Sequence, residues 1–161
     1  MAKKWPKRSV PKPRGLDYQR TTEEISAWGF VGNTLGHLKE REFVKAVSLG
    51  REEGPGWPEW FVSVRQATEE EDRKGIDVVV ETEDAGSFFI QLKISERKAK
   101  DFLASPREGR TRIAVIVLRL DDGPETMRNR FLEAAKRERR WLLQRRNGVR
   151  RLPREPTVVF S

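Results

Sequence analysis

The N-terminal third of the chain has apolar residues at the 3.6-residue spacing of a helix. We predict helix from residue 21 to Leu49, interrupted by Gly29, Gly32 and Asn33, with a second segment that starts near residue 34. Gly50 is expected to end it, because glycine favours helix ends. Two adjacent stripes follow from the spacing: Leu35, Leu38, Glu42, Ala46 and Leu49 form one, and Gly36, Glu40, Phe43 and Val47 form the other.

Short runs of β-forming residues dominate the middle of the chain. They predict strands at residues 59–68, 76–82, 87–95 and 112–120, with one more short strand in the tail after residue 150. Residues 69–75 are interpreted as a polar connection and residues 83–86 as a tight turn. Helices are predicted at residues 96–106, which Pro106 ends, and at residues 124–146, where Pro124 suits the first turn.

The resulting order is helix, three strands, helix, strand, helix. Three consecutive strands favour an antiparallel meander, and the strand–helix–strand return favours a parallel, right-handed crossover. We therefore expect an α/β fold with a mixed sheet between helices. The strand at residues 112–120 is the most apolar, so it should lie inside the sheet with both faces covered. The length predicts one domain, residues 21–161, after a basic, flexible arm over residues 1–20.

The chain has a net charge of +8, which favours a polyanionic partner, chiefly nucleic acid. It has no cysteine, which excludes disulfides, thiolate metal ligands and a thiol nucleophile. No apolar stretch approaches the roughly 20 residues of a membrane span, so no membrane partner is expected. The basic N-terminus lacks the apolar region of a secretory signal, and we expect a cytoplasmic protein.

Candidate chemistry lies on the second and third predicted strands. Alternate residues of a strand share a face, so Gln91 and Lys93 point one way while Ile90 and Leu92 point into the core. A hairpin would bring Asp77, from the strand before, beside this pair. Carboxylate, amide and carbonyl oxygens suit a hard divalent ion, and a lysine ammonium can orient water or stabilise a phosphate. The arrangement is what metal-assisted phosphodiester cleavage requires.

The sequences Gly75-Ile76-Asp77 and Gln91-Leu92-Lys93, on adjoining strands in this element order, resemble the PD-(D/E)xK nuclease superfamily. The resemblance implies a restriction-endonuclease-like αβββαβ core and cleavage of DNA with Mg²⁺ or Mn²⁺. It implies catalytic roles for Asp77, Gln91 and Lys93, with the Leu92 carbonyl as a further metal ligand. Gln91 replaces the usual acid, which is similar to the Mrr-type enzymes and should weaken metal binding. Asp77 also follows Ile76 where the signature has proline.

The resemblance also implies a glutamate from the first helix in the metal site. Glu40 and Glu42 are both candidates: Glu40 follows Gly36 by one turn, and Glu42 interrupts an apolar stripe. We favour Glu40 and leave both open. Asp72 and Ser95 are additional candidates beside the signature residues. The single histidine, His37, is interpreted as a residue of the helix surface.

Basic residues at both ends of the chain suit contacts with a phosphate backbone, which are independent of sequence and sensitive to salt. The candidates are Lys3, Lys4, Lys7, Arg8, Arg128, Arg130, Lys136, Arg137 and Arg140. The hypothesis is a DNA nuclease, with DNA preferred to RNA as partner and a homodimer or partner protein left open. The alternatives are a catalytically inactive nuclease-fold module that binds DNA or RNA, alone or in a nucleoprotein complex, and an unrelated basic protein that binds structured RNA.

Overall fold

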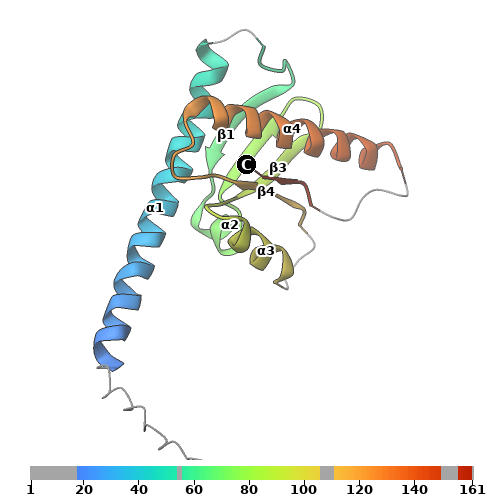
Figure 1. Ribbon diagram of the computed structural model, residues 1–161. Helices are drawn as coiled ribbons and strands as arrows, with labels where there is room; N and C mark the ends of the chain where they lie inside the picture. Colours follow the sequence, from blue (N-terminus) through green and yellow to red (C-terminus); the bar gives the residue numbers. More distant parts are fainter. Residues whose placement is uncertain (1–17, 54–55, 106–110, 150–155, 161) are drawn as a thin grey trace, which may run out of the picture. The chain divides into compact units, whose positions relative to one another are not determined.

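The structure is a computed structural model that describes residues 18–53, 56–105, 111–149 and 156–160. Side chains are described from Thr34 onward, with the exception of residue 53. The chain forms two compact units, residues 1–34 and 35–161, and the second contains the sheet drawn in Figure 1. Residues 1–17 of the predicted basic arm lie outside the described residues.

In the described part of the chain, five strands form one mixed sheet in the order β1-β2-β3-β4-β5. Their bounds are β1 Phe61–Gln66, β2 Val78–Thr82, β3 Gly86–Lys93, β4 Ile113–Val117 and β5 Val158–Val159. The first three strands pair antiparallel, whereas β3 with β4 and β4 with β5 pair parallel. The predicted α/β class, the meander and the parallel return are therefore confirmed. β4 is buried along its whole length between two neighbours, as expected.

Four helices are present in the described residues: α1 Tyr18–Glu53, α2 Glu69–Arg73, α3 Glu96–Ala104 and α4 Pro124–Arg146. α3 and α4 agree with the prediction. The Ser95 hydroxyl caps α3 by accepting a hydrogen bond from the Lys98 backbone N–H at 3.3 Å. Pro124 lies in the first turn of α4, where its missing N–H costs no helical hydrogen bond.

Helix α1 is continuous, so the predicted break and the predicted end at Gly50 are wrong. A glycine destabilises a helix interior by only about 1 kcal/mol, which packing can offset. Gly50 has a packing role instead. A methyl group there would lie 2.5 Å from Trp57 Cζ2 and 2.8 Å from Arg128 Nε. The absent side chain therefore lets an indole ring and a guanidinium approach the helix backbone.

The polar run after β1 is a helix, α2, and not a plain connection. Thr68 and Glu71 form a capping box. The Thr68 backbone N–H donates to Glu71 Oε2 at 2.7 Å, and the Glu71 N–H donates to the Thr68 hydroxyl at 3.3 Å. Arg65 also donates two hydrogen bonds to the same carboxylate, at 2.7 and 2.8 Å. No residue of α2 is buried, so hydrophobic periodicity could not indicate it, although the Thr-x-x-Glu spacing does.

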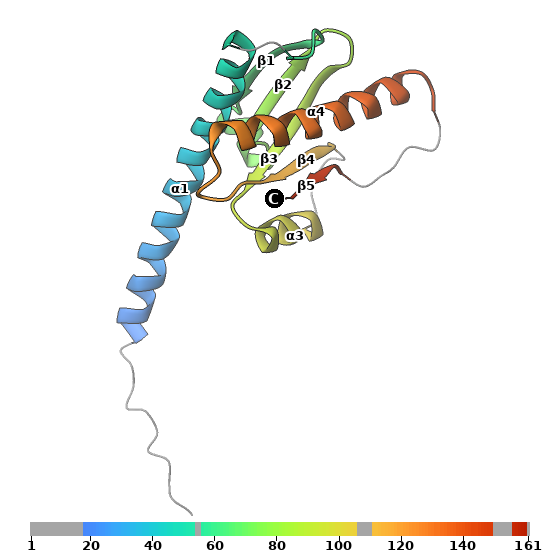
Figure 2. The ribbon, with the colours of Figure 1, turned by 45° about the horizontal axis from the view of Figure 1, so that its top comes forward.

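The main core lies between the sheet and two helices, α4 and the part of α1 within the second unit (Figures 1 and 2). Phe131 of α4 is fully buried, with ring centres 6.2 Å from Phe43 of α1 and 5.4 Å from Phe61 of β1. α3 covers the opposite face, where Ala99 packs with Val115 and Val117 of β4. The sheet is thus the middle layer of three.

The structure shows which of the two predicted stripes of α1 is buried. Phe43 and Val47 are fully buried, whereas Leu35 and Leu38 are exposed. The stripe with Phe43 and Val47 therefore packs in the core, whereas the stripe that begins at Leu35 is exposed at its N-terminal end. The Glu42 side chain is 58% exposed, so it is not a buried acid within an apolar stripe.

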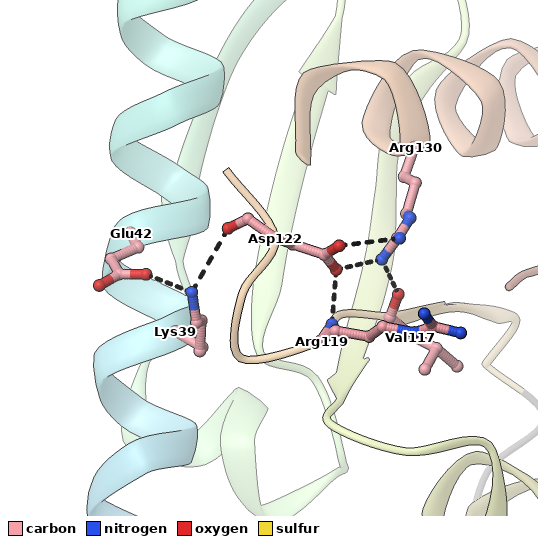
Figure 3. Close-up of polar contacts among 6 residues, drawn as sticks. All are labelled: Lys39, Glu42, Val117, Arg119, Asp122 and Arg130. Carbon is pink, nitrogen blue, oxygen red and sulfur yellow. Dashed lines mark hydrogen bonds and ion pairs between the residues drawn. The ribbon is translucent and has the colours of Figure 1, made fainter. Parts of the chain in front are cut away.

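Polar contacts tie the loop after β4 to both α1 and α4 (Figure 3). Lys39 of α1 pairs with Glu42 at 2.8 Å and donates to the Asp122 carbonyl oxygen at 3.5 Å. Arg130 of α4 donates to the Val117 carbonyl at 2.6 Å and forms a two-pronged ion pair with the Asp122 carboxylate. These contacts hold the turn of α1 that contains Lys39 at a fixed position beside the sheet.

Candidate functional site

Asp77 is the residue immediately before β2, and backbone hydrogen bonds fix its position. The register of β2 and β3 begins with Val78 opposite Ile90. The Asp77 N–H donates to the Ile90 carbonyl at 2.9 Å, and the Asp77 carbonyl accepts from the Ala67 N–H at 2.8 Å. The backbone of Asp77 is therefore held from both sides.

The Asp77 carboxylate is bound by two donors from β3. The Gln91 side-chain Nε2 donates to Asp77 Oδ2, and the Leu92 backbone N–H donates to the same oxygen at 2.7 Å. Asp77 and Gln91 are 6% and 5% exposed. The structure thus brings together the two residues that the sequence placed on adjoining strands. The described residues provide no donor to the second oxygen, Oδ1.

Lys93 lies two residues beyond Gln91 on the same face of β3, and its side chain is half-buried. Its ammonium Nζ lies 5.0 Å from the centre of the Phe102 ring, which α3 contributes. Burial lowers the pKa of Lys93, while the nearby carboxylates of Asp77 and Glu40 act in the opposite direction. The same ammonium therefore faces the acidic residues of the site and an aromatic ring.

Burial raises the pKa of the Asp77 carboxyl to about 7. The hydrogen bond from the Leu92 N–H and the positive charge of Lys93 lower this pKa. The negative charges of Glu40 and Asp72 raise it further. A buried acid whose neighbours are also acids is destabilised when ionised. A cation beside the carboxylate would remove this penalty.

A cavity of about 230 Å³ opens beside Asp77. Its walls come from α1, the end of β1, α2 and the residue before β2: they are His37, Glu40, Arg41, Gln66, Ala67, Thr68, Glu69, Asp72 and Asp77. Of the two glutamates left open by the sequence, Glu40 borders this cavity. Glu42 is instead paired with Lys39. Asp72 also borders the cavity.

His37, which the sequence placed on the helix surface, and Arg41, which it did not single out, both border the cavity. His37 Nδ1 lies 3.2 Å from Glu40 Oε2, although its side chain is 64% exposed. Glu40 follows His37 by three residues and Arg41 follows it by four, and this helical spacing is the signal that could have indicated them. Ser95, another candidate, has its hydroxyl occupied as the cap of α3.

The residues present fit a hard divalent ion in part. Asp77 Oδ1 is the oxygen left available by the two protein donors, and Glu40 borders the same cavity. Gln91 donates to Asp77 through its side-chain nitrogen and so orients the Asp77 carboxylate. Binding of a metal ion by Gln91 Oε1 stays a prediction. Within the described ranges, no group of three or more His, Cys, Asp or Glu side chains has a geometry that could hold a metal. The carboxylates that border the cavity are those of Glu40, Glu69, Asp72 and Asp77.

The predicted phosphate-contacting residues of α4 divide into two sets. Arg128 donates to the Ala46 carbonyl at 2.9 Å, and Arg130 binds Asp122, so both hold the helix against the rest of the fold. Lys136, Arg137 and Arg140 are exposed, and Arg137 pairs with Glu133 at 2.5 Å. The other candidates for phosphate contacts, Lys3, Lys4, Lys7 and Arg8, lie outside the described residues.

Comparisons with family models, with curated proteins and with solved structures found no match to this chain. In the part of the chain that the structure describes, no helix combines the length and the apolar character needed to span a membrane.

Proposed function

We propose that this protein is a divalent-metal-dependent nuclease that hydrolyses phosphodiester bonds in DNA, with a core of the PD-(D/E)xK kind. The observation that carries the proposal is the hydrogen bond of Gln91 to Asp77 on the sheet face that also carries Lys93, with Asp77 and Glu40 both bordering one cavity. The observed order α1, β1, β2, β3, α3, β4 supports the assignment of the core, with the short α2 inserted between β1 and β2.

Asp77 and Glu40 would hold Mg²⁺ or Mn²⁺, with the Leu92 carbonyl and the Gln91 side chain as weaker neutral contributors. The ion supplies Lewis-acid stabilisation of the negative charge on the phosphate. Gln91 and the Leu92 N–H fix the orientation of the Asp77 carboxylate. The Lys93 ammonium orients the attacking water or stabilises the extra charge as the water oxygen bonds to phosphorus and one P–O bond breaks.

The test is cleavage of labelled single-stranded, duplex, flapped and branched DNA, with Mn²⁺ or Mg²⁺ and with EDTA. Lys93→Ala and Asp77→Asn should abolish metal-dependent cleavage while circular dichroism shows a folded protein. Lys100→Ala is the matched control, because Lys100 is an exposed lysine of α3. Wild-type rates in Lys93→Ala, or cleavage that persists in EDTA, would refute the proposal.

A second candidate is a nuclease-fold module that binds nucleic acid without cutting it. It is favoured by the lack, among the described residues, of three or more His, Cys, Asp or Glu side chains placed to hold a metal ion, and by the use of Gln91 as a hydrogen-bond donor. Calorimetry with Mn²⁺ discriminates between the two. A lack of heat at millimolar metal, together with tight and salt-sensitive binding of DNA, supports the module. RNA that competes far better than DNA would instead favour the binding of structured RNA.

A further inference from the structure

Phe102 of α3 lies close to two residues of the candidate site region, Lys93 and Gly75. The centre of its ring lies 5.0 Å from Lys93 Nζ. A methyl group on Gly75 would lie 2.9 Å from Phe102 Cε2 and 3.4 Å from Gln91 Oε1. The ring edge, the Gly75 backbone and the Gln91 carboxamide therefore meet at one point, while Lys93 contacts the ring nearby.

The position of the ring is set by packing that does not involve Lys93. Phe102 packs against two separate apolar clusters on this side of the sheet. The buried members are Ile76, Val79 and Ile113 in one cluster, and Ala99, Val115 and Val117 in the other. An aromatic ring held between two clusters has few orientations open to it. Phe102 is thus a fixed surface against which a flexible side chain can rest.

Lys93 needs such a surface. Its ammonium sits at the end of a flexible four-carbon stem, so many positions are open to it unless neighbours restrict them. An aromatic face attracts an ammonium within about 6 Å of the ring centre, and the attraction grows when water is excluded. The 5.0 Å separation lies within that limit.

We propose that Phe102 is the positioning residue for Lys93, holding its ammonium on the sheet face that carries Asp77 and Gln91. The inference rests on the proposed nuclease function and adds a residue to it. Phe102 does not touch the reacting phosphate. It acts through Lys93, and its loss should reduce turnover more than it reduces substrate binding.

The experiment compares Phe102→Leu with Leu103→Ala, the neighbouring residue of α3 that packs in the second cluster. Chemical denaturation shows whether both variants are folded. Metal-dependent DNA cleavage then gives kcat and KM for each. A group misplaced by about 1 Å can cost roughly 100-fold in rate. We expect kcat to fall about 10- to 100-fold in Phe102→Leu with KM nearly unchanged, and to stay near wild type in Leu103→Ala.

A second measurement follows the contact without any need for activity. In the NMR spectrum, the ring current of Phe102 should shift the Lys93 side-chain methylene resonances upfield of those of the exposed lysines. The shift should disappear in Phe102→Leu and persist in Leu103→Ala. The inference is overturned if the spectrum of the wild-type protein lacks this upfield shift. It is also overturned if folded Phe102→Leu cleaves DNA with the same kcat as the wild-type protein. If the shift is present but wild-type protein cuts no DNA, the nuclease proposal fails and the contact stands.

Discussion

The side-chain nitrogen of Gln91, on β3, donates a hydrogen bond to the carboxylate of Asp77, the residue before β2. In the signature that this sequence resembles, an acid occupies the position of Gln91. Gln91→Glu should therefore replace an attraction by a repulsion when no metal is present, at a cost of about 1–3 kcal/mol in unfolding free energy. With Mn²⁺ present, the added carboxylate should tighten metal binding at least about tenfold.

Urea unfolding with and without Mn²⁺, together with calorimetry, measures both effects. Gln66→Glu is the matched control, because it adds an acid to the cavity that Asp77 borders without changing the hydrogen bond from Gln91 to Asp77. Equal gains in affinity for the two variants would show that Gln91 has no special place in the metal site.

The raised pKa of Asp77 predicts a dependence of stability on pH. The folded protein keeps a proton on Asp77 up to a pKa of about 7, whereas the unfolded chain loses it near 3.8. The folded state therefore binds more protons between these values, so stability decreases as pH rises from 4 to 7 and then levels off. The unfolding free energy should decrease by at most about 4 kcal/mol over this range, since one pKa unit corresponds to about 1.4 kcal/mol.

Urea unfolding of wild type and Asp77→Asn across this range isolates the contribution, because other groups titrate in both proteins. Wild type should lose stability relative to the variant as pH rises. A constant difference would show that Asp77 ionises normally. Binding of Mn²⁺ by wild type should weaken about tenfold for each pH unit below 7, since the ion must displace the proton.

The placement of α1 predicts different effects for its two glutamates. Glu40 borders the cavity of Asp77, while the Glu42 side chain is 58% exposed and paired with Lys39. Glu40→Gln should weaken Mn²⁺ binding and slow cleavage by about tenfold or more, whereas Glu42→Gln should leave both near wild type. Each variant is the control for the other. The reverse order of effects would mean that α1 is rotated differently about its axis in solution.

Alanine substitutions at Gly75 and Gly86 test whether the close packing of Gly75 against Phe102 matters for stability and activity. Both have positive φ, at +80° and +83°, so alanine at either is strained by about 1–2 kcal/mol. Only at Gly75 would the new methyl group collide with Phe102, because nothing lies within 4 Å at Gly86. Gly75→Ala should lose more unfolding free energy and also cleavage activity. Equal losses of both in Gly86→Ala would contradict this account.

Two exposed cations of α4 predict the salt dependence of DNA binding. Lys136 and Arg140 lie one turn apart and are both exposed. The double variant Lys136→Ala, Arg140→Ala should bind duplexes of any sequence more weakly. Its negative slope of log K against log salt concentration should become shallower by about 1.8. Fluorescence anisotropy at several salt concentrations measures the slope. An unchanged slope would remove this surface of α4 from the proposed interface.

Much of the fold could be predicted because it depends on short stretches of chain. Alternation along residues 87–95 separates Ile90 and Leu92 from Gln91 and Lys93, and the buried set confirms this. The turn at residues 83–86 makes the hairpin of β2 and β3 that the sequence indicated. The capping box at Thr68 is just as local, but α2 buries no residue and leaves no trace in the hydrophobic pattern.

The sequence by itself determined which residue types alternate on each strand, where the turn between β2 and β3 lies, and hence the mixed sheet, because these features depend on neighbours along the chain. Only the tertiary structure decided that Glu40 borders the cavity, that Phe102 lies against Lys93 and that Arg128 binds Ala46. Each of these depends on how one element is rotated or docked against another. That choice is made by packing between residues distant in the chain, which local periodicity does not encode.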